Sequence, residues 1–122
     1  MVEKEYPVER KTIIPDLTYS PEGREIFIEI ETLIGTLEPM KKIDETVEKY
    51  KDHLEANIWI VLKPVSALLH YEELKARKKA YKLLYEDKKI EFKVLTLLAS
   101  KDKFKWELMK LDNFLGGVKS AR

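Results

Sequence analysis

Residues 24–32 read Arg-Glu-Ile-Phe-Ile-Glu-Ile-Glu-Thr and carry the clearest strand pattern in the chain. Side chains alternate between the two faces of a strand, so the apolar and acidic residues separate here. One face receives the isoleucines and the other receives the glutamates with a phenylalanine: Ile26, Ile28 and Ile30 against Glu25, Phe27, Glu29 and Glu31. Taken alone, this alternation is typical of an antiparallel strand with a solvent-exposed polar face.

The residues before this strand predict its partner. Residues 20–23, Ser-Pro-Glu-Gly, are a turn signal, and residues 8–19 read as another strand. Pro15 lies within that strand and has no N–H group, so we expect it at a sheet edge or at a bend. Two strands joined by a short loop with Pro and Gly predict an antiparallel hairpin.

The rest of the chain alternates between helix and strand patterns. Pro39 suits the first turn of a helix, and apolar residues then recur every three or four positions: Met40, Ile43, Val47, Tyr50 and Leu54. Residues 58–62 are wholly apolar, which predicts a central strand buried on both faces. A second helix is expected over 70–86, with an inward face formed by Tyr71, Leu74, Tyr81 and Leu84 or Tyr85.

A strand over 90–98 and a short helix over 104–114, ended by Gly116-Gly117, complete the pattern. The sequence therefore predicts an α/β fold with a mixed central β-sheet, in which an antiparallel hairpin is followed by helix-linked strands and helices flank the sheet. The 122 residues suit a single domain over 1–122. Its core is expected over about 8–98, with a basic C-terminal helix and tail over 99–122.

Composition narrows the class of protein. Hydrophobic residues make up 44% and charged residues 37% of the chain, which excludes a disordered protein. No apolar run approaches the roughly 18–20 residues that span a bilayer, so no membrane association is expected. The absence of cysteine excludes a thiolate metal site and fits a cytoplasmic, intracellular location. Glutamine is also absent, and lysine, glutamate and isoleucine are abundant, a composition common in thermophile proteins.

Three carboxylates of the predicted hairpin are candidates for chemistry. Asp16 follows Pro15 in the first strand, and Glu29 and Glu31 share one face of the second. In a hairpin with a short turn they could converge at one end of the sheet. Carboxylate oxygens are ligands that Mg²⁺ or Mn²⁺ prefers, and a bound cation would relieve the repulsion between three close negative charges. The pattern predicts a divalent-metal site.

Pro15-Asp16, twelve intervening residues, and Glu29-Ile30-Glu31 resemble the motif of the PD-(D/E)XK, or restriction-endonuclease-like, nuclease superfamily. The resemblance covers roughly residues 8–98 and includes the order of strands and helices. It implies Mg²⁺- or Mn²⁺-dependent hydrolysis of phosphodiester bonds in DNA, with Asp16 and Glu29 as metal ligands. Glu31 would bind the metal or orient the attacking water.

The chain departs from the superfamily pattern at two points. The last motif residue is usually lysine, whereas Glu31 stands here; Lys41 or Lys42 is the candidate for a relocated lysine that stabilises charge on the phosphate. Only about seven residues precede the first predicted strand, so the N-terminal core helix of the superfamily is absent or vestigial. Both departures favour an alternative hypothesis, a catalytically inactive module with the nuclease fold that binds nucleic acid or a partner protein.

A second candidate surface is basic and aromatic. Lys101, Lys103 and Lys105 surround Trp106, and such residues could neutralise phosphates while the indole stacks on a base. Trp106 could equally cover the core or a subunit interface. Since so short a chain offers little surface for gripping a duplex, a homodimer or a partner protein is also expected.

Overall fold

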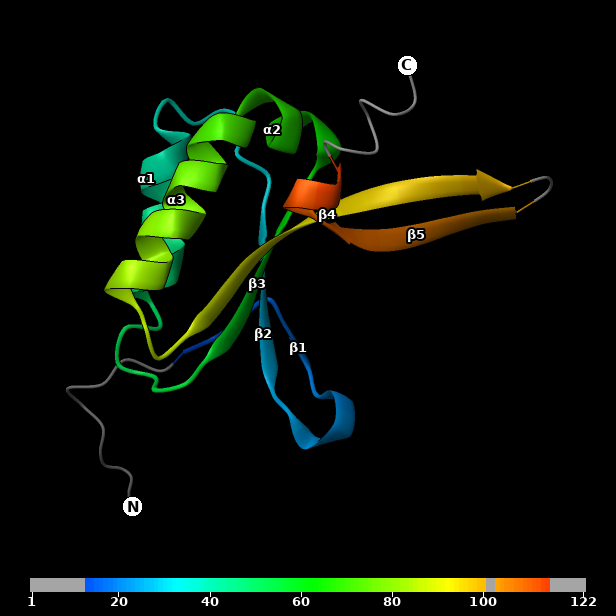
Figure 1. Cartoon of the computed structure of the whole chain (residues 1–122). Helices are drawn as coiled ribbons and strands as arrows, with labels where there is room; N and C mark the ends of the chain where they lie inside the picture. Colours follow the sequence, from blue (N-terminus) through cyan, green and yellow to red (C-terminus); the bar gives the residue numbers. More distant parts are fainter. Residues whose placement is uncertain (1–12, 101–102, 115–122) are drawn as a thin grey trace.

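The computed structural model describes residues 13–100 and 103–114, and Figure 1 shows the chain. In these residues the labelled strands and helices follow one another in this order: β1 (Leu17–Tyr19), β2 (Ile26–Glu31), α1 (Pro39–Glu48), β3 (Asn57–Leu62), α2 (Pro64–Leu69), α3 (Tyr71–Leu84), β4 (Lys89–Ser100) and β5 (Lys103–Lys110). A 3-10 turn, η1 (Pro21–Gly23), joins β1 to β2. The turn uses left-handed backbone at Glu22 (φ 51°) and Gly23 (φ 82°), which explains the glycine at its end.

The five strands form one sheet in the order β1-β2-β3-β4-β5. The two outer pairs, β1–β2 and β4–β5, are antiparallel, and the two inner pairs are parallel. This arrangement confirms the predicted α/β class with a mixed sheet and an antiparallel hairpin. Both crossovers run the same way across the sheet, and right-handed crossovers of this kind put their helices on one face. Figure 1 shows the helices gathered on that side.

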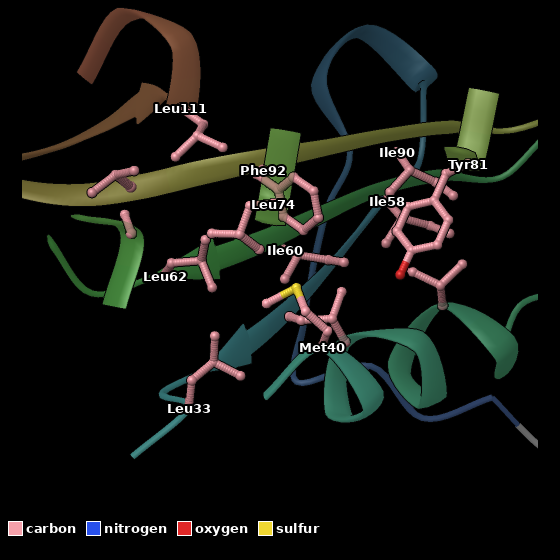
Figure 2. Packing of buried hydrophobic residues seen from close by; sticks show 14 of the residues in the cluster. Leu33, Met40, Ile58, Ile60, Leu62, Leu74, Tyr81, Ile90, Phe92 and Leu111 are labelled. Atoms are coloured by element: carbon pink, nitrogen blue, oxygen red, sulfur yellow. The ribbon is translucent and has the colours of Figure 1, made fainter. Parts of the chain in front are cut away.

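The hydrophobic core lies between this face and the helices. Helix α1 contributes Met40, Ile43 and Val47, and its first residue is Pro39, as the sequence predicted. The sheet contributes residues that lie in register across the inner strands, among them Phe27, Ile58, Ile60, Leu62, Ile90, Phe92 and Val94. Figure 2 shows Met40 of α1 beside Ile60 of β3 in this core. Burial of this apolar area is the main force that holds the helices on the sheet.

Several element boundaries differ from the sequence prediction. Of the strand expected over 8–19, residues 8–12 lie outside the described residues, and only Leu17–Tyr19 pair with β2. Leu54 is exposed because α1 ends at Glu48, before its pattern of apolar residues does. Helix α2 was not expected; Pro64 begins it. On the second predicted helix, Tyr85 packs against the core and Leu84 is exposed.

The helix predicted over 104–114 is wrong, and so is the basic helix of the 99–122 segment. Residues 103–110 form β5, which pairs with the outer half of β4 from Lys93↔Lys110 to Ser100↔Lys103. Apolar residues alternate here with period two, at positions 104, 106 and 108, and this fits a strand rather than a helix. Only residues 111–114 are helical, and they bury Leu111 and Phe114. Gly116-Gly117 lies outside the described residues.

Candidate acidic site beneath helix α1

The glutamate face of β2 is the buried face of the sheet. Glu29 is only 3% exposed and Glu31 is also buried, whereas Ile30 on the opposite face is 50% exposed. In register, Glu29 pairs with Ile60 and Glu31 with Leu62, so both carboxylates lie in the layer that α1 covers. The solvent-exposed polar strand face that the alternation suggested is therefore wrong. Buried carboxylates need donors or cations to offset lost hydration.

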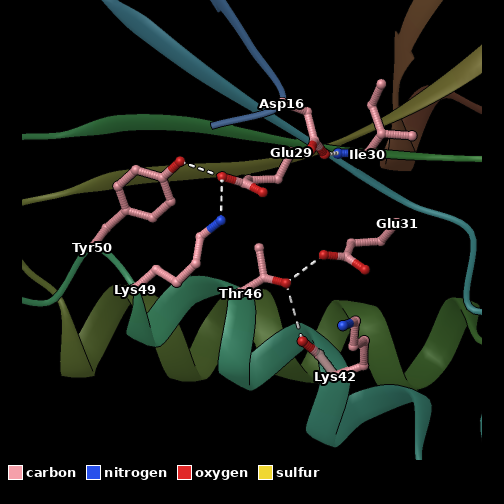
Figure 3. A network of polar contacts seen from close by, with 8 residues as sticks. All are labelled: Asp16, Glu29, Ile30, Glu31, Lys42, Thr46, Lys49 and Tyr50. Atoms are coloured by element: carbon pink, nitrogen blue, oxygen red, sulfur yellow. Dashed lines mark hydrogen bonds and ion pairs between the residues drawn. The ribbon is translucent and has the colours of Figure 1, made fainter. Parts of the chain in front are cut away.

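Glu29 receives two such contacts from the two residues that directly follow α1 (Figure 3). The hydroxyl of Tyr50 donates a hydrogen bond to Oε2 of Glu29, and Nζ of Lys49 lies 2.9 Å from the same oxygen. Tyr50 is fully buried, while 43% of the Lys49 side chain is exposed. The pKa of Tyr50 is raised, first by burial and then by the hydrogen bond and negative charge of Glu29, with a further contribution from Asp16. The phenol therefore stays protonated as a donor.

Glu31 is held by a residue of α1 that lies about one turn nearer the N-terminus of the helix. The hydroxyl of Thr46 donates a hydrogen bond to Oε2 of Glu31 and also lies 3.1 Å from the carbonyl oxygen of Lys42. The hydroxyl has one hydrogen and can donate it to only one of these two oxygens at a time. A carboxylate oxygen is a stronger acceptor than a carbonyl oxygen, so the bond to Glu31 is favoured. Figure 3 shows the Lys42 side chain on the same side of α1, below Glu31. No ion pair joins Lys42 or Lys41 to a carboxylate of this site within the described residues.

Asp16 is exposed and reaches β2 from the edge of the sheet. Its Oδ2 accepts a hydrogen bond of 2.7 Å from the backbone N–H of Ile30, the residue between the two glutamates (Figure 3). The ladder between β1 and β2 ends at Leu17↔Ile28, so this N–H has no strand partner and the side chain replaces one. The structure thus brings Asp16 to the backbone position that separates Glu29 from Glu31.

The three carboxylates are neighbours with different orientations. Within residues 13–100 and 103–114, no group of three or more His, Asp or Glu side chains is arranged to hold a metal ion. Glu29 and Glu31 point toward α1, whereas Asp16 approaches the strand backbone. The contacts described above involve one oxygen of each carboxylate, Oδ2 of Asp16 and Oε2 of Glu29 and Glu31. None of these contacts involves the second oxygen. Carboxylate oxygens are nevertheless the type of ligand that a hard divalent cation prefers.

Sequence reasoning missed Lys49 and Thr46. Their signal was helical spacing, since Lys42, Thr46 and Lys49 follow one another at intervals of four and three residues and so lie on one side of α1. The choice of Lys41 and Lys42 rested on nearness in sequence to Glu31. In the structure, Lys49 is the lysine in contact with a motif carboxylate.

The predicted basic and aromatic surface is divided between two faces of β5. Lys103 and Lys105 are exposed on one face, and Trp106, also exposed, is on the other because strand residues alternate. Lys101 lies outside the described residues. The lysines and the indole of β5 therefore do not form one continuous patch.

No helix in the described part of the chain is both long and apolar enough to cross a membrane. Comparison of the chain with models of protein families, with curated proteins and with solved structures finds no match. The site's own geometry is accordingly the basis for a functional proposal.

Proposed function

We propose that this chain is a metal-dependent nuclease that hydrolyses phosphodiester bonds in DNA, with the acidic site beneath α1 as its catalytic centre. The observation that carries the proposal is the burial of Glu29 and Glu31 on the helix-covered face of β2. A carboxylate in such a layer is unfavourable for folding, since an apolar side chain of similar volume would pack there without desolvation. Residues kept in an unfavourable environment are candidates for function.

The contacts of the site suit a role for each residue. Asp16 and Glu29 would hold Mg²⁺ or Mn²⁺, and Glu31 would bind the ion or orient water. A divalent ion supplies polarisation of the phosphodiester and a lowered pKa of the attacking water. Lys49, half-exposed beside Glu29, takes the role expected for Lys41 or Lys42, because its ammonium group can offset charge on a phosphate.

The restriction-endonuclease-like fold is part of the same proposal. Three observations support it: an antiparallel hairpin carries the acidic motif, helix α1 follows, and β3 then pairs in parallel with β2. The mixed order of the sheet brings Asp16 beside the strand that carries both glutamates.

A second candidate function is a binding or assembly module without catalysis. It is favoured by the donors that the protein itself supplies to the glutamates, Tyr50 and Lys49 to Glu29 and Thr46 to Glu31. With these partners the two carboxylates are stabilised without a metal ion. In this case the acidic layer would be a structural network, and the chain would contact nucleic acid or a partner protein elsewhere.

A cleavage assay distinguishes the two functions. Linear, circular and single-stranded DNA are incubated with Mg²⁺ or Mn²⁺ and with wild type, Asp16→Asn, Glu29→Gln or Lys49→Met. Glu25→Gln is the matched control, because Glu25 is an exposed glutamate directly before the same strand. The nuclease proposal expects metal-dependent cleavage that falls at least 100-fold in the three site variants and is unchanged in the control. Cleavage that survives all three substitutions, or no cleavage by wild type, refutes it.

A further inference from the structure

The face of the sheet opposite the helices carries an apolar surface of its own. Register places Leu17, Ile28 and Trp59 side by side on this face, and Leu95 and Leu97 pair there with Leu108 and Trp106 of β5. We call it the open face and define it by its exposed large side chains: Leu17, Tyr19, Ile30, Leu95, Leu97, Trp106 and Leu108. Each of the seven is 37–64% exposed. Figure 1 shows the helices on the other side of the sheet.

The outer part of the open face lies on an arm. Beyond Val94, strands β4 and β5 continue as a two-stranded ribbon that extends away from the helices (Figure 1). A lone two-stranded hairpin is marginally stable in water, because one of its faces has nothing to pack against. On this arm, that face carries Leu95, Leu97, Trp106 and Leu108. The arm therefore gains stability from any partner that covers these side chains.

We infer that the open face is a homodimer interface, in which a second copy of this chain covers the arm and the β1–β2 edge. When the roughly 200 Å² of a fully exposed aromatic side chain is taken for all seven residues, their exposed fractions correspond to at most about 700 Å². This area lies within the roughly 600–1,000 Å² that each partner buries in a protein interface of standard size.

The chemistry of the arm favours protein over nucleic acid as its partner. Its exposed side chains Leu95, Leu97, Trp106 and Leu108 are apolar, whereas a nucleic-acid surface needs free cations to replace condensed counterions. The exposed cations on this side of the sheet, Arg24, Lys89 and Lys110, line a pocket with Trp59 and Lys93 beside the arm. Lys93, near the middle of the face, already contacts Glu91 and Trp59. Its Nζ lies 3.2 Å from Glu91 and 4.5 Å from the ring centroid of Trp59, and its side chain is only 11% exposed. Lys93 thus forms a packed polar boundary between the arm and the β1–β2 edge and offers little charge to a phosphate.

A two-fold axis makes one apolar face complementary to itself. In an isologous dimer both copies use the same patch, so the chain needs no second, complementary surface. This inference does not depend on the acidic site, because Glu29 and Glu31 lie on the helix-covered face. Loss of cleavage and loss of dimerisation are therefore separate outcomes.

The experiment measures mass and Trp106 exposure together. Analytical ultracentrifugation of wild type and of Leu97→Asp is run between about 1 and 100 μM, with Leu83→Asp as control. Leu83 on α3 is 77% exposed and lies outside the open face, so it is a leucine that, like Leu97 (48% exposed), lies at the surface. A Trp59→Phe variant leaves Trp106 as the one tryptophan reporter. We expect dimers for wild type and Leu83→Asp, a dissociation constant raised at least 100-fold in Leu97→Asp, and a blue shift of Trp106 emission as dimers form.

Three results would overturn the inference. The first is a monomeric wild type at every concentration, which would indicate that the chain's own remaining residues or a different partner covers the face. The second is a dimer that Leu97→Asp and Trp106→Glu leave intact while circular dichroism shows both variants folded. The third is a Trp106 emission that shifts with added single-stranded DNA but not with protein concentration, which would assign the face to nucleic acid.

Discussion

Replacing Tyr50 with phenylalanine tests whether the acidic layer is a stabilising network. The ring keeps its place against Phe27, 5.3 Å between centroids, so no cavity forms. What is lost is the hydroxyl that donates to Glu29, a carboxylate only 3% exposed. A hydrogen bond to a charged group contributes about 1.5–3 kcal/mol to stability. Lys49 remains beside Glu29 and offsets part of the loss, so we expect Tyr50→Phe to lower the free energy of unfolding by about 2 kcal/mol.

Urea denaturation followed by circular dichroism measures this change, with Tyr71→Phe as the control. Tyr71 packs at the margin of the core, and its ring lies beside Lys75. Its substitution is expected to change stability by less than about 0.5 kcal/mol. A double-mutant cycle with Glu29→Gln then isolates the pair. If Tyr50→Phe costs under about 0.5 kcal/mol, or costs the same with and without Glu29, the reasoning about the buried carboxylate is refuted.

Three further predictions concern pH, helix packing and backbone strain. Burial and neighbouring carboxylates raise the pKa of Tyr50 and Tyr81 in the folded protein. The contribution of these two tyrosines to stability should therefore be constant below about pH 10 and fall above it by up to about 1.4 kcal/mol per pH unit for each tyrosine, which urea denaturation of wild type and the two Tyr→Phe variants above about pH 9 would measure. Asp44→Ala breaks the bonds that join α1 to α3, including one of 2.5 Å from the Tyr81 hydroxyl, and should cost about 1–2 kcal/mol in a thermal or urea melt, whereas exposed Glu45→Ala should cost little. Glu55 has a φ of 59°, so Glu55→Gly should raise stability by about 0.5–1 kcal/mol, and a decrease would contradict the strain.

The sequence predicted those parts of the fold in which local pattern and burial agree. The hairpin, the helix from Pro39 and the strand β3 combine strong periodicity or apolar runs with clear turn residues. It did not predict β5, because residues 104–114 contain both a period-two and a helical spacing of apolar side chains, and pairing with β4 selects the first. That pairing is a long-range contact and leaves no mark in a short window of sequence.

The sequence predicted that Asp16, Glu29 and Glu31 lie near one another, but it did not predict what surrounds them. Asp16, Glu29 and Glu31 were chosen from motif spacing, and the structure places them around one backbone position. Burial of the glutamate face could not be read from alternation alone, since either face of β2 could have turned inward. The position of α1 determines which face is covered, and it brings Tyr50, Thr46 and Lys49 to the carboxylates.

The contact between Asp16 and the N–H of Ile30 also protects the sheet against aggregation. An edge strand with free backbone groups can recruit the edge of another molecule, and repeated recruitment produces fibrils. At this edge β1 has only three residues, Pro15 offers no donor, and the Asp16 side chain occupies the next donor of β2. At the opposite edge, Lys103, Lys105 and Lys110 place charges along β5. Growth of the sheet strand by strand is therefore disfavoured at both ends, which is compatible with the closed, face-to-face dimer proposed above.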